Sequence, residues 1–267
     1  MRAWRPTQFL VGCAGVHLSA ALLLLLHAEL WRWALGAVLL DHLALLAASL
    51  WPRSTLLGAN LVRLPEAAAR RREIAITIDD GPDPQVTPQV LAILAAHGAQ
   101  ATFFCIGERA AALPDLCRAI VAAGHAVENH GQQHRKRQSL LGPRGWLREV
   151  GAAQITLEAI TGQRPRYFRA LAGLRNPFLD PVLHRLGLHL ASWTRRGYDT
   201  RSGDADAVLA RLIDKLAAGD ILLLHDGHAA ATAAGRPVIL DVLPRLLDAL
   251  AACQLKPITL RSACNPY

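Results

Sequence analysis

Two long apolar runs open the chain and set its first fifth apart from the rest. Residues 9–26 carry no formal charge, and residues 34–51 are apolar apart from Asp41 and His42 near their centre. Each run has eighteen residues, which is just enough for a helix to cross a bilayer. We therefore expect residues 1–53 to form two transmembrane helices, about 9–26 and 34–51, that pair as a hairpin.

A cleaved signal peptide or a single anchor is the alternative, since Arg2 and Arg5 precede the first run. No convincing small-residue cleavage site follows that run, and the second run begins almost at once, which favours the hairpin. Interfacial or buried helices are a third interpretation.

Asp41 is the costly residue of the second run. If it were unpaired in the bilayer, it would cost about 2.5–3.5 kcal/mol on insertion scales. In a hairpin that turns near Leu30, His17 reaches a similar depth, so we expect a contact between His17 and Asp41. An Asp41 that faces protein or headgroups is the alternative.

Basic residues flank the two runs. Arg2 and Arg5 precede the first, and Arg53, Arg63 and residues 70–72 follow the second. The positive-inside rule then predicts a multi-pass protein of the bacterial inner (cytoplasmic) membrane, with both ends and the following domain in the cytoplasm. We expect the 70–72 cluster to lie against anionic headgroups. The five cysteines form no CxxC pair, which fits the same reducing compartment. If the first run were cleaved, the domain would face outward.

The rest of the chain is long enough for one globular domain. Hydrophobic residues make up 52% of the sequence, which excludes a disordered protein. The formal net charge is +8, but the arginines are scattered and no aromatic residues interleave with them, so nucleic acid is not an expected partner. No protein partner can be named from the sequence. We expect residues 54–72 to form a basic linker and residues 73–267 one domain.

Strand and helix patterns alternate through that domain. Short β-branched or apolar runs indicate strands, and longer runs with helical spacing indicate helices. The expected strands are 73–78, 101–106, 126–129, 167–169, 188–193 and 221–224, and the expected helices are 86–97, 114–123, 146–161, 181–186, 205–218 and 239–251. This alternation predicts a parallel α/β architecture. Polar residues gather where the strands end, which is where a barrel of this kind builds its active site.

Two pairs of residues in this domain suggest chemistry. Asp79 and Asp80 end the first strand, and adjacent carboxylates stay ionised together only near a cation or hydrogen-bond donors. An ordinary Asp-Gly turn is the structural alternative. His130 and His134 stand four residues apart, and on a helical turn both imidazoles would point to one metal ion. With eleven histidines in the chain, a chance pair is the alternative.

Two single residues complete the set. His225 follows a buried strand, and a surface or capping histidine is the structural alternative. Arg169 lies at another strand end, and by itself it does not indicate a function. Two imidazoles and one carboxylate together make a metal-binding set common in hydrolytic sites. A second carboxylate can take a proton from water, and a separate histidine can donate one to a leaving group. The combination therefore indicates a metal-dependent hydrolase.

Five motifs in order carry a closer resemblance: TIDDGPDP (77–84), ATFFCIG (101–107), GHAVENHGQQH (124–134), FRALAGLRNP (168–177) and LLLHDG (222–227). They resemble the polysaccharide deacetylase family, also called the NodB homology domain or carbohydrate esterase family 4, over about residues 73–259. The resemblance implies a distorted (β/α) barrel that removes an acyl group from a sugar amide. It also implies that Asp80, His130 and His134 bind a divalent metal ion, which we expect to be zinc.

The resemblance implies roles for further residues. Asp79 is the general base, and Arg169 orients Asp79 and keeps it ionised. His225 is the general acid. A backbone N–H near Ala172 shares the developing oxyanion with the metal.

The chain departs from the family in one segment. Where the family has Arg-x-Pro-aromatic-Gly, residues 169–173 read Arg-Ala-Leu-Ala-Gly, so a backbone donor survives but a proline and an aromatic wall are lost. The stretch WTRRGYD (193–199) resembles the fourth family motif only loosely. Asp199 is an accessory residue that tunes His225, or else a turn aspartate, and Asp226 is a second accessory candidate.

The expected topology restricts which substrates the domain can reach. A cytoplasmic domain cannot reach wall polymer, but it can reach sugars on lipid carriers at the inner leaflet. We therefore expect an N-deacetylase of an amino sugar in a lipid-linked or glycolipid intermediate of envelope polysaccharide biosynthesis. Deformylation of such an intermediate, deacetylation of an extracytoplasmic polysaccharide, and an inactive sugar-binding relative are the alternatives.

Overall fold

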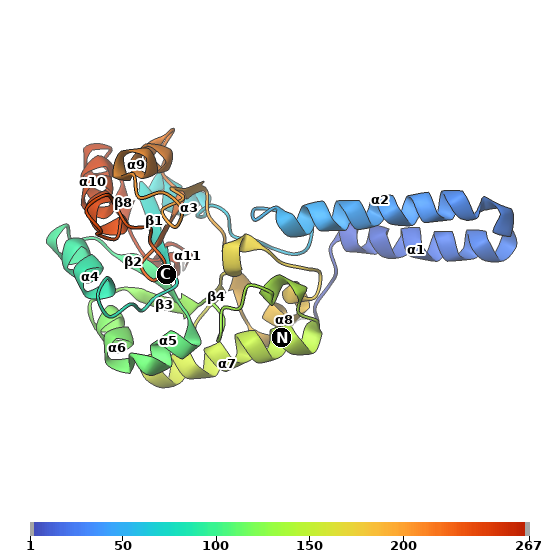
Figure 1. The fold of residues 1–267 in the computed structure, drawn as a ribbon, viewed down its shortest axis with the longest axis horizontal. Helices are drawn as coiled ribbons and strands as arrows, with labels where there is room; N and C mark the ends of the chain where they lie inside the picture. The colour runs from blue at the N-terminus through green and yellow to red at the C-terminus, as the bar shows by residue number, and fades with distance from the viewer. Residues whose placement is uncertain (1–2, 265–267) are drawn as a thin grey trace.

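The N-terminal part of the chain is a helical hairpin that projects from an α/β domain (Figure 1). The computed structural model describes residues 3–264. Helices α1 (Gln8–Leu26) and α2 (Trp31–Leu50) lie side by side and are joined by the 3-10 turn η1 (Ala28–Leu30). Both are long and apolar enough to cross a membrane by length and composition. Only 11% of each apolar window is buried, so neither helix is packed in the core of the domain.

The expected proximity of His17 and Asp41 is present across the hairpin. Nδ1 of His17 lies 3.6 Å from Oδ2 of Asp41, whose side chain is 7% exposed. This distance exceeds a hydrogen bond. The same Nδ1 donates instead to the carbonyl of Cys13 at 2.8 Å. The hairpin therefore brings the two side chains within ion-pair distance, without a hydrogen bond between them.

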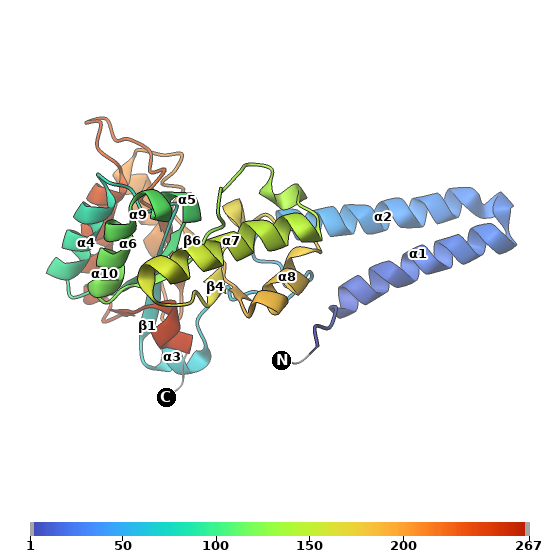
Figure 2. The same ribbon diagram turned by 90° about the horizontal axis from the view of Figure 1, so that it is seen from below.

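Residues 54–72 pack against the domain as part of it. Leu57 is fully buried, and Leu61 exchanges backbone hydrogen bonds with the segment of residues 190–192. Helix α3 (Glu66–Arg70) follows and lies away from the hairpin (Figure 2). The 70–72 arginines bond to Glu66, to Glu73 and to the carbonyls of residues 253 and 254. The expectation that this cluster faces headgroups therefore finds no support in the fold.

The α/β domain is built on one parallel sheet. Its strands are β1 (Glu73–Asp79), β2 (Ala101–Cys105), β3 (Ala126–Asn129), β4 (Tyr167–Phe168), β5 (His189–Leu190), β6 (Arg195–Arg196), β7 (Ile221–His225) and β8 (Lys256–Pro257). They follow the order β5-β4-β3-β2-β1-β7-β6, with β8 beside β1. Within residues 3–264 no pairing joins β5 to β6. The predicted distorted (β/α) barrel is thus confirmed as a curled sheet that stays open between these two edges.

Helices cover this sheet. They are α4 (Thr87–Ala96), α5 (Gly107–Ala112), α6 (Pro114–Ala122), α7 (Pro143–Thr161), α8 (Leu179–Leu186), α9 (Ala205–Ile213), α10 (Ile239–Ala252) and α11 (Leu260–Cys264), with 3-10 turns η2 (Gln138–Leu140) and η3 (Leu171–Gly173). The twelve expected strands and helices are all present, with their ends shifted by a few residues. The elements that the sequence pattern missed are short, such as β6 and β8.

The central strand β1 is buried on both faces, as its β-branched sequence predicts. Ile74, Ile76 and Ile78 belong to the larger core cluster, and Ala75 packs in a second cluster with Phe104. In the register of the sheet, Asp79 lies opposite both Phe104 on β2 and His225 on β7. The polar residues that follow these strands therefore meet at one edge.

Candidate active site

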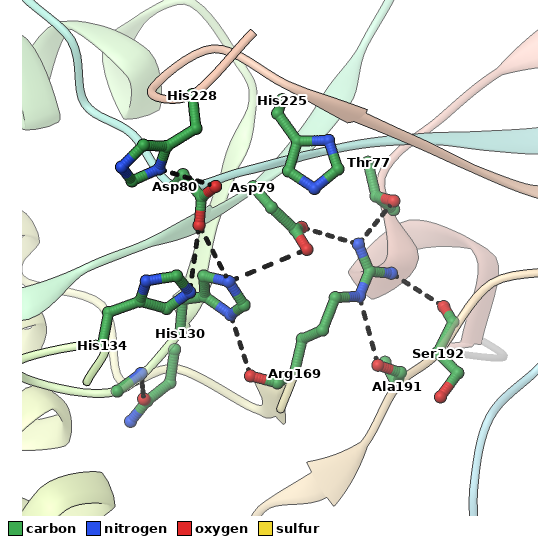
Figure 3. Close-up of polar contacts among 12 residues, drawn as sticks. Thr77, Asp79, Asp80, His130, His134, Arg169, Ala191, Ser192, His225 and His228 are labelled. Carbon is green, nitrogen blue, oxygen red and sulfur yellow. Dashed lines mark hydrogen bonds and ion pairs between the residues drawn. The ribbon is translucent and has the colours of Figure 1, made fainter. Parts of the chain in front are cut away.

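The carboxyl ends of the central strands surround a cavity of about 470 Å³. Most of the sequence-predicted site residues line it, namely Asp79, Asp80, His130, His134, Ala172 and His225. Arg169 and Asp199 are fully buried and contact two of these residues from behind. Figure 3 shows most of this group converging from separate segments of the chain. Asp226 is also buried, but it does not line the cavity.

Asp80 is the centre of the candidate metal site. Its Oδ1 lies 3.2 Å from Nε2 of His130 and 3.1 Å from Nε2 of His134 (Figure 3). Burial alone would raise the pKa of Asp80, but its hydrogen bond with His228 and the charge of His130 hold it well below its usual range. Asp80 therefore presents an ionised carboxylate to both imidazoles.

These three side chains fit a cation. Nδ1 of His130 donates to the carbonyl of Arg169 at 2.9 Å, so Nε2 faces Asp80 and offers its lone pair when the ring is neutral. Burial lowers the pKa of His134 to about 3, so this imidazole is neutral. Oδ1 of Asp80 is buried without a hydrogen-bond partner among the described residues. Three acceptor atoms that face one another call for a positive ion between them, and two histidines with one carboxylate are suitable zinc ligands.

The loop that carries the two histidines differs from the sequence expectation. A helical turn was predicted to align them, but residues 130–134 are irregular, with φ of 88° at Gly131 and 54° at His134. The Glu149 side chain on α7 organises the loop, because its Oε1 accepts the backbone N–H groups of Gln133 at 2.8 Å and His134 at 3.1 Å. The imidazoles still converge, through loop geometry and not through helical spacing.

Arg169 fixes the other carboxylate of the pair. Its side chain is fully buried, and Nη1 donates to Oδ1 of Asp79 at 2.7 Å and to the Thr77 hydroxyl at 2.7 Å. Nη2 and Nε bond to carbonyls of residues 192 and 191, and the guanidinium carbon lies 4.1 Å from the ring centroid of Phe104. With all these partners Arg169 can adopt one position only. Asp79 is therefore held with Oδ2 on the His130 side, 3.9 Å from Nε2.

His225, beside Asp79 in the sheet, has a carboxylate partner of its own. Its Nδ1 donates to Oδ1 of Asp199 at 2.8 Å, so the lone pair is on Nε2 when the ring is neutral. Burial alone would lower the pKa of His225, but the hydrogen bond and charge of Asp199, with the charges of Asp79 and Asp80, raise it above its ordinary value. A protonated imidazole at this position can donate a proton.

Two residues outside the predicted set contact the candidate metal site. Nδ1 of His228 donates to Oδ2 of Asp80 at 2.9 Å, and Arg109 donates to the Asp80 carbonyl at 2.8 Å. Arg109 also lies 3.2 Å from Nε2 of His228. The spacing His225-Asp-Gly-His228 was the available signal for His228, whereas Arg109 lies on α5, which the sequence pattern did not indicate.

Asp226 supports the turn that carries the two carboxylates. Its side chain accepts a hydrogen bond from the Thr87 hydroxyl, and burial raises its pKa to about 7. A Cβ added to Gly81 would lie 2.5 Å from the Asp226 carboxylate, so only glycine allows this approach. Asp226 thus packs behind the reaction site without facing it.

Ala172 occupies the segment that departs from the family pattern. It has a left-handed backbone with φ of 52° and lines the same cavity as the carboxylates. Within residues 3–264 its N–H has no intramolecular partner, while the next two N–H groups bond to Ala170 and Leu171. A free backbone donor is therefore available at the cavity wall.

Comparison with known proteins agrees with this arrangement. Residues 66–191 match the protein family described as polysaccharide deacetylase. The chain is 36% identical over 186 residues to a chitooligosaccharide deacetylase of Azorhizobium caulinodans, covering 67% of this chain and 88% of that protein. It is 30% identical over 172 residues to a peptidoglycan-N-acetylglucosamine deacetylase of Bacillus cereus, covering 61% of this chain and 76% of that protein. The solved family 4 carbohydrate esterase of Streptomyces lividans in complex with acetate has a TM-score of 0.62 at 30% identity, over 69% of this chain and 91% of that one.

Proposed function

Because this chain belongs to the polysaccharide deacetylase family, we propose that it hydrolyses the N-acetyl group of an amino sugar that is attached to a lipid. The chain is a carbohydrate N-deacetylase, a hydrolase of amide bonds, as its relatives are. The proposal adds a divalent metal ion, roles for single residues and a membrane-bound substrate. The observation that carries it is the arrangement of Asp79, the Asp80–His130–His134 set and His225 around one cavity.

Asp80, His130 and His134 would hold the metal ion, and their two imidazoles and one carboxylate favour zinc. When bound, such an ion polarises the amide carbonyl and lowers the pKa of water.

Asp79 acts as the general base. Arg169 binds Oδ1 of Asp79, so Oδ2 remains to take a proton from the water that attacks the amide carbon. The attack places negative charge on the carbonyl oxygen, and the N–H of Ala172 donates to it from the cavity wall. Both groups are positioned before the substrate arrives, so little reorganisation is needed during the reaction.

His225 acts as the general acid. Its Nε2 gives a proton to the amide nitrogen as the C–N bond breaks, so that the products are acetate and the free amine. Asp199 holds the ring by Nδ1 and stabilises its protonated form. Asp79 takes up one proton from water, and His225 releases one proton to the amine. Proton exchange with solvent then returns both side chains to their starting protonation states.

The junction between hairpin and domain supports a membrane-bound substrate. The N–H of Arg175 donates to the Ser49 carbonyl in the last turn of α2 at 3.3 Å, and the Ser192 hydroxyl donates to the Pro52 carbonyl at 2.7 Å. Gly173 packs against Pro52 so closely that an added Cβ would lie 2.4 Å from its Cβ. The neighbouring residues of η3 line the cavity. No spacer therefore separates the end of α2 from the substrate cavity, and a hairpin in the bilayer would hold that cavity at the membrane surface.

Acetate and formate release tests this function. The full-length protein, loaded with zinc, is incubated with lipid extract from bacterial membranes, with peptidoglycan or with chitooligosaccharide, beside Asp79→Asn protein. Acetate release from the lipid extract by the intact protein alone is the expected result. Release from peptidoglycan or chitooligosaccharide but not from lipid would overturn the lipid-linked substrate, and formate would overturn the acetyl assignment. If Asp79→Asn releases as much acetate as the intact protein, Asp79 is not the base.

Topology is tested separately. We propose that the domain faces the cytoplasm, and a reporter fused after Tyr267 should then be active only in that compartment. Activity of a periplasmic reporter would overturn this orientation and favour an extracytoplasmic polysaccharide as substrate.

A further inference from the structure

One cation at the cavity has no counter-charge. Arg196 on β6 lines the same cavity as His225, and its Nε is buried without a hydrogen-bond partner among the described residues. No carboxylate within residues 3–264 forms an ion pair with it, although an arginine carries five N–H donors. A partly buried guanidinium in this state is costly unless another molecule satisfies it.

Two aromatic rings hold the Arg196 side chain. Its guanidinium carbon lies 5.5 Å from the ring centroid of Trp193 and 5.1 Å from that of Tyr198. Cation–π contacts at these distances orient a guanidinium without using its N–H donors. The donors at its edge are therefore positioned and still free, which is how arginine binds planar or tetrahedral oxyanions.

The acidic groups near the cavity are engaged elsewhere. Asp79 is bound by Arg169, Asp199 by His225, and Glu108 accepts a hydrogen bond from the Gln133 amide at 2.9 Å. Asp80 faces the imidazoles of the metal site. None of them neutralises Arg196 in this structure.

A second cation adds to the positive charge around the cavity. Lys136 is exposed and also lines the cavity. It stands between Arg135 and Arg137, which are exposed too. The cavity mouth therefore attracts anions, whereas a neutral saccharide would gain nothing from this charge.

We propose that Arg196 binds a phosphate group of the sugar substrate. The proposal rests on the function given above and names the substrate class: an N-acetylated amino sugar with a phosphate close to the reacting amide. A sugar 1-phosphate, a nucleotide sugar and a sugar on a polyprenyl phosphate all present this group. Arg196 thereby determines specificity without taking part in the bond changes.

Matched substrates test the proposal with the full-length, zinc-loaded protein. N-acetylglucosamine 1-phosphate and methyl N-acetylglucosaminide differ in the anomeric phosphate, and polyprenyl-phosphate-linked N-acetylglucosamine adds the lipid. We expect kcat/KM to be at least about tenfold higher for the phosphate than for the methyl glycoside. Arg196→Gln should lower that ratio by about tenfold, mainly through KM, because a hydrogen bond between charged groups contributes that much. Arg196→Lys should have an intermediate ratio, since it keeps the charge and loses the fork of donors.

Arg201→Gln is the control variant, since this exposed arginine lies five residues further on and outside the cavity lining. Its phosphate-to-methyl ratio should equal that of the parent protein. A ratio that Arg196→Gln leaves unchanged overturns the proposal. A higher rate on the polyprenyl substrate than on the sugar 1-phosphate identifies the lipid phosphate as the source of the group, and equal rates identify a soluble sugar phosphate.

Calorimetry separates this proposal from the proposed function. If the intact protein deacetylates none of the three substrates, the proposed function fails. Binding of N-acetylglucosamine 1-phosphate that is about tenfold weaker in Arg196→Gln would still support Arg196 as a phosphate ligand. Equal binding by both proteins would overturn it.

Discussion

The carboxylate of Asp199 holds His225 at two points. Its Oδ1 accepts Nδ1–H of the imidazole at 2.8 Å, and its Oδ2 accepts the backbone N–H of the same residue at 2.7 Å. Asp199 is fully buried and lies in the stretch WTRRGYD, where the family likeness is weak. The double contact sets both the position and the charge of the ring that faces the cavity.

Asp199→Asn should move the pH profile of the reaction. His225 donates its proton only in the protonated form, so the rate falls as pH rises through its pKa. Asp199 contributes to raising that pKa, and its loss should shift the alkaline limb to lower pH. We expect kcat to fall by at least about tenfold at pH 8. Profiles of kcat from pH 5 to 9 check this, and an unshifted alkaline limb would show that Asp199 has only a structural role.

Asp79→Asn should separate chemistry from metal binding. Loss of the base is expected to lower kcat by about 10²–10⁴-fold. The zinc content of the purified protein should not change, because the ligand set contains Asp80 and not Asp79. Asp80→Asn is the matched variant one residue away and should lose zinc as well as activity. Elemental analysis measures the zinc content of each variant, and acetate release measures its activity. Zinc loss from Asp79→Asn would show that Asp79 is a zinc ligand.

Glu149→Ala should weaken zinc binding from outside the site. The Glu149 carboxylate accepts two N–H groups of the loop that ends at His134, so its removal frees one ligand. Supporting residues of this kind change metal affinity by about 10–100-fold. Glu149→Gln retains an acceptor oxygen and should lose less. Competition with a chelator measures the affinities, and equal zinc affinity in the parent and Glu149→Ala proteins would contradict the prediction.

Gly173→Ala should disturb the junction between hairpin and domain. Its φ is 74°, and an added Cβ would meet Pro52 at 2.4 Å and Trp193 at 2.9 Å. Gly162 is the matched control, with φ of 68° and nothing within 4 Å of an added Cβ. Alanine at Gly162 should cost about 1–2 kcal/mol through its left-handed backbone alone, and alanine at Gly173 about 1–3 kcal/mol more. Thermal unfolding in detergent compares them, and equal losses of stability would mean that the junction is loosely packed.

The sequence predicted six of the eight strands of the domain and most of the residues at their ends. Asp79, Asp80 and His225 follow buried apolar strands, so the pattern that indicates the strand also locates the polar residue. His130 was found by its spacing from His134, and it too lies directly after a strand, β3. The roles that the family resemblance implies for them remain predictions that the experiments above examine.

The supporting residues could not be predicted in this way. Glu149 lies on α7, fifteen residues after His134, and no local pattern marks which polar side chain of a helix turns toward a loop. The position of Arg196 at the cavity depends on β6. This strand has only two residues, and it pairs with β7, which lies more than twenty residues later in the sequence. Contacts between distant segments decide both features, and a single sequence does not contain them in periodic form.

The close seating of η3 on Pro52 has a consequence for selectivity along a saccharide. Pro52 packs against Gly173 and accepts a hydrogen bond from Ser192, so with the hairpin in a bilayer we expect the reacting amide to lie at one height above the lipid. An acetamido group on the first sugars from the lipid meets that height, and the same group further out on a growing polymer passes beyond reach. The membrane anchor would then determine which sugar of the saccharide is deacetylated, and the cavity would need no contact with the distant end of the saccharide.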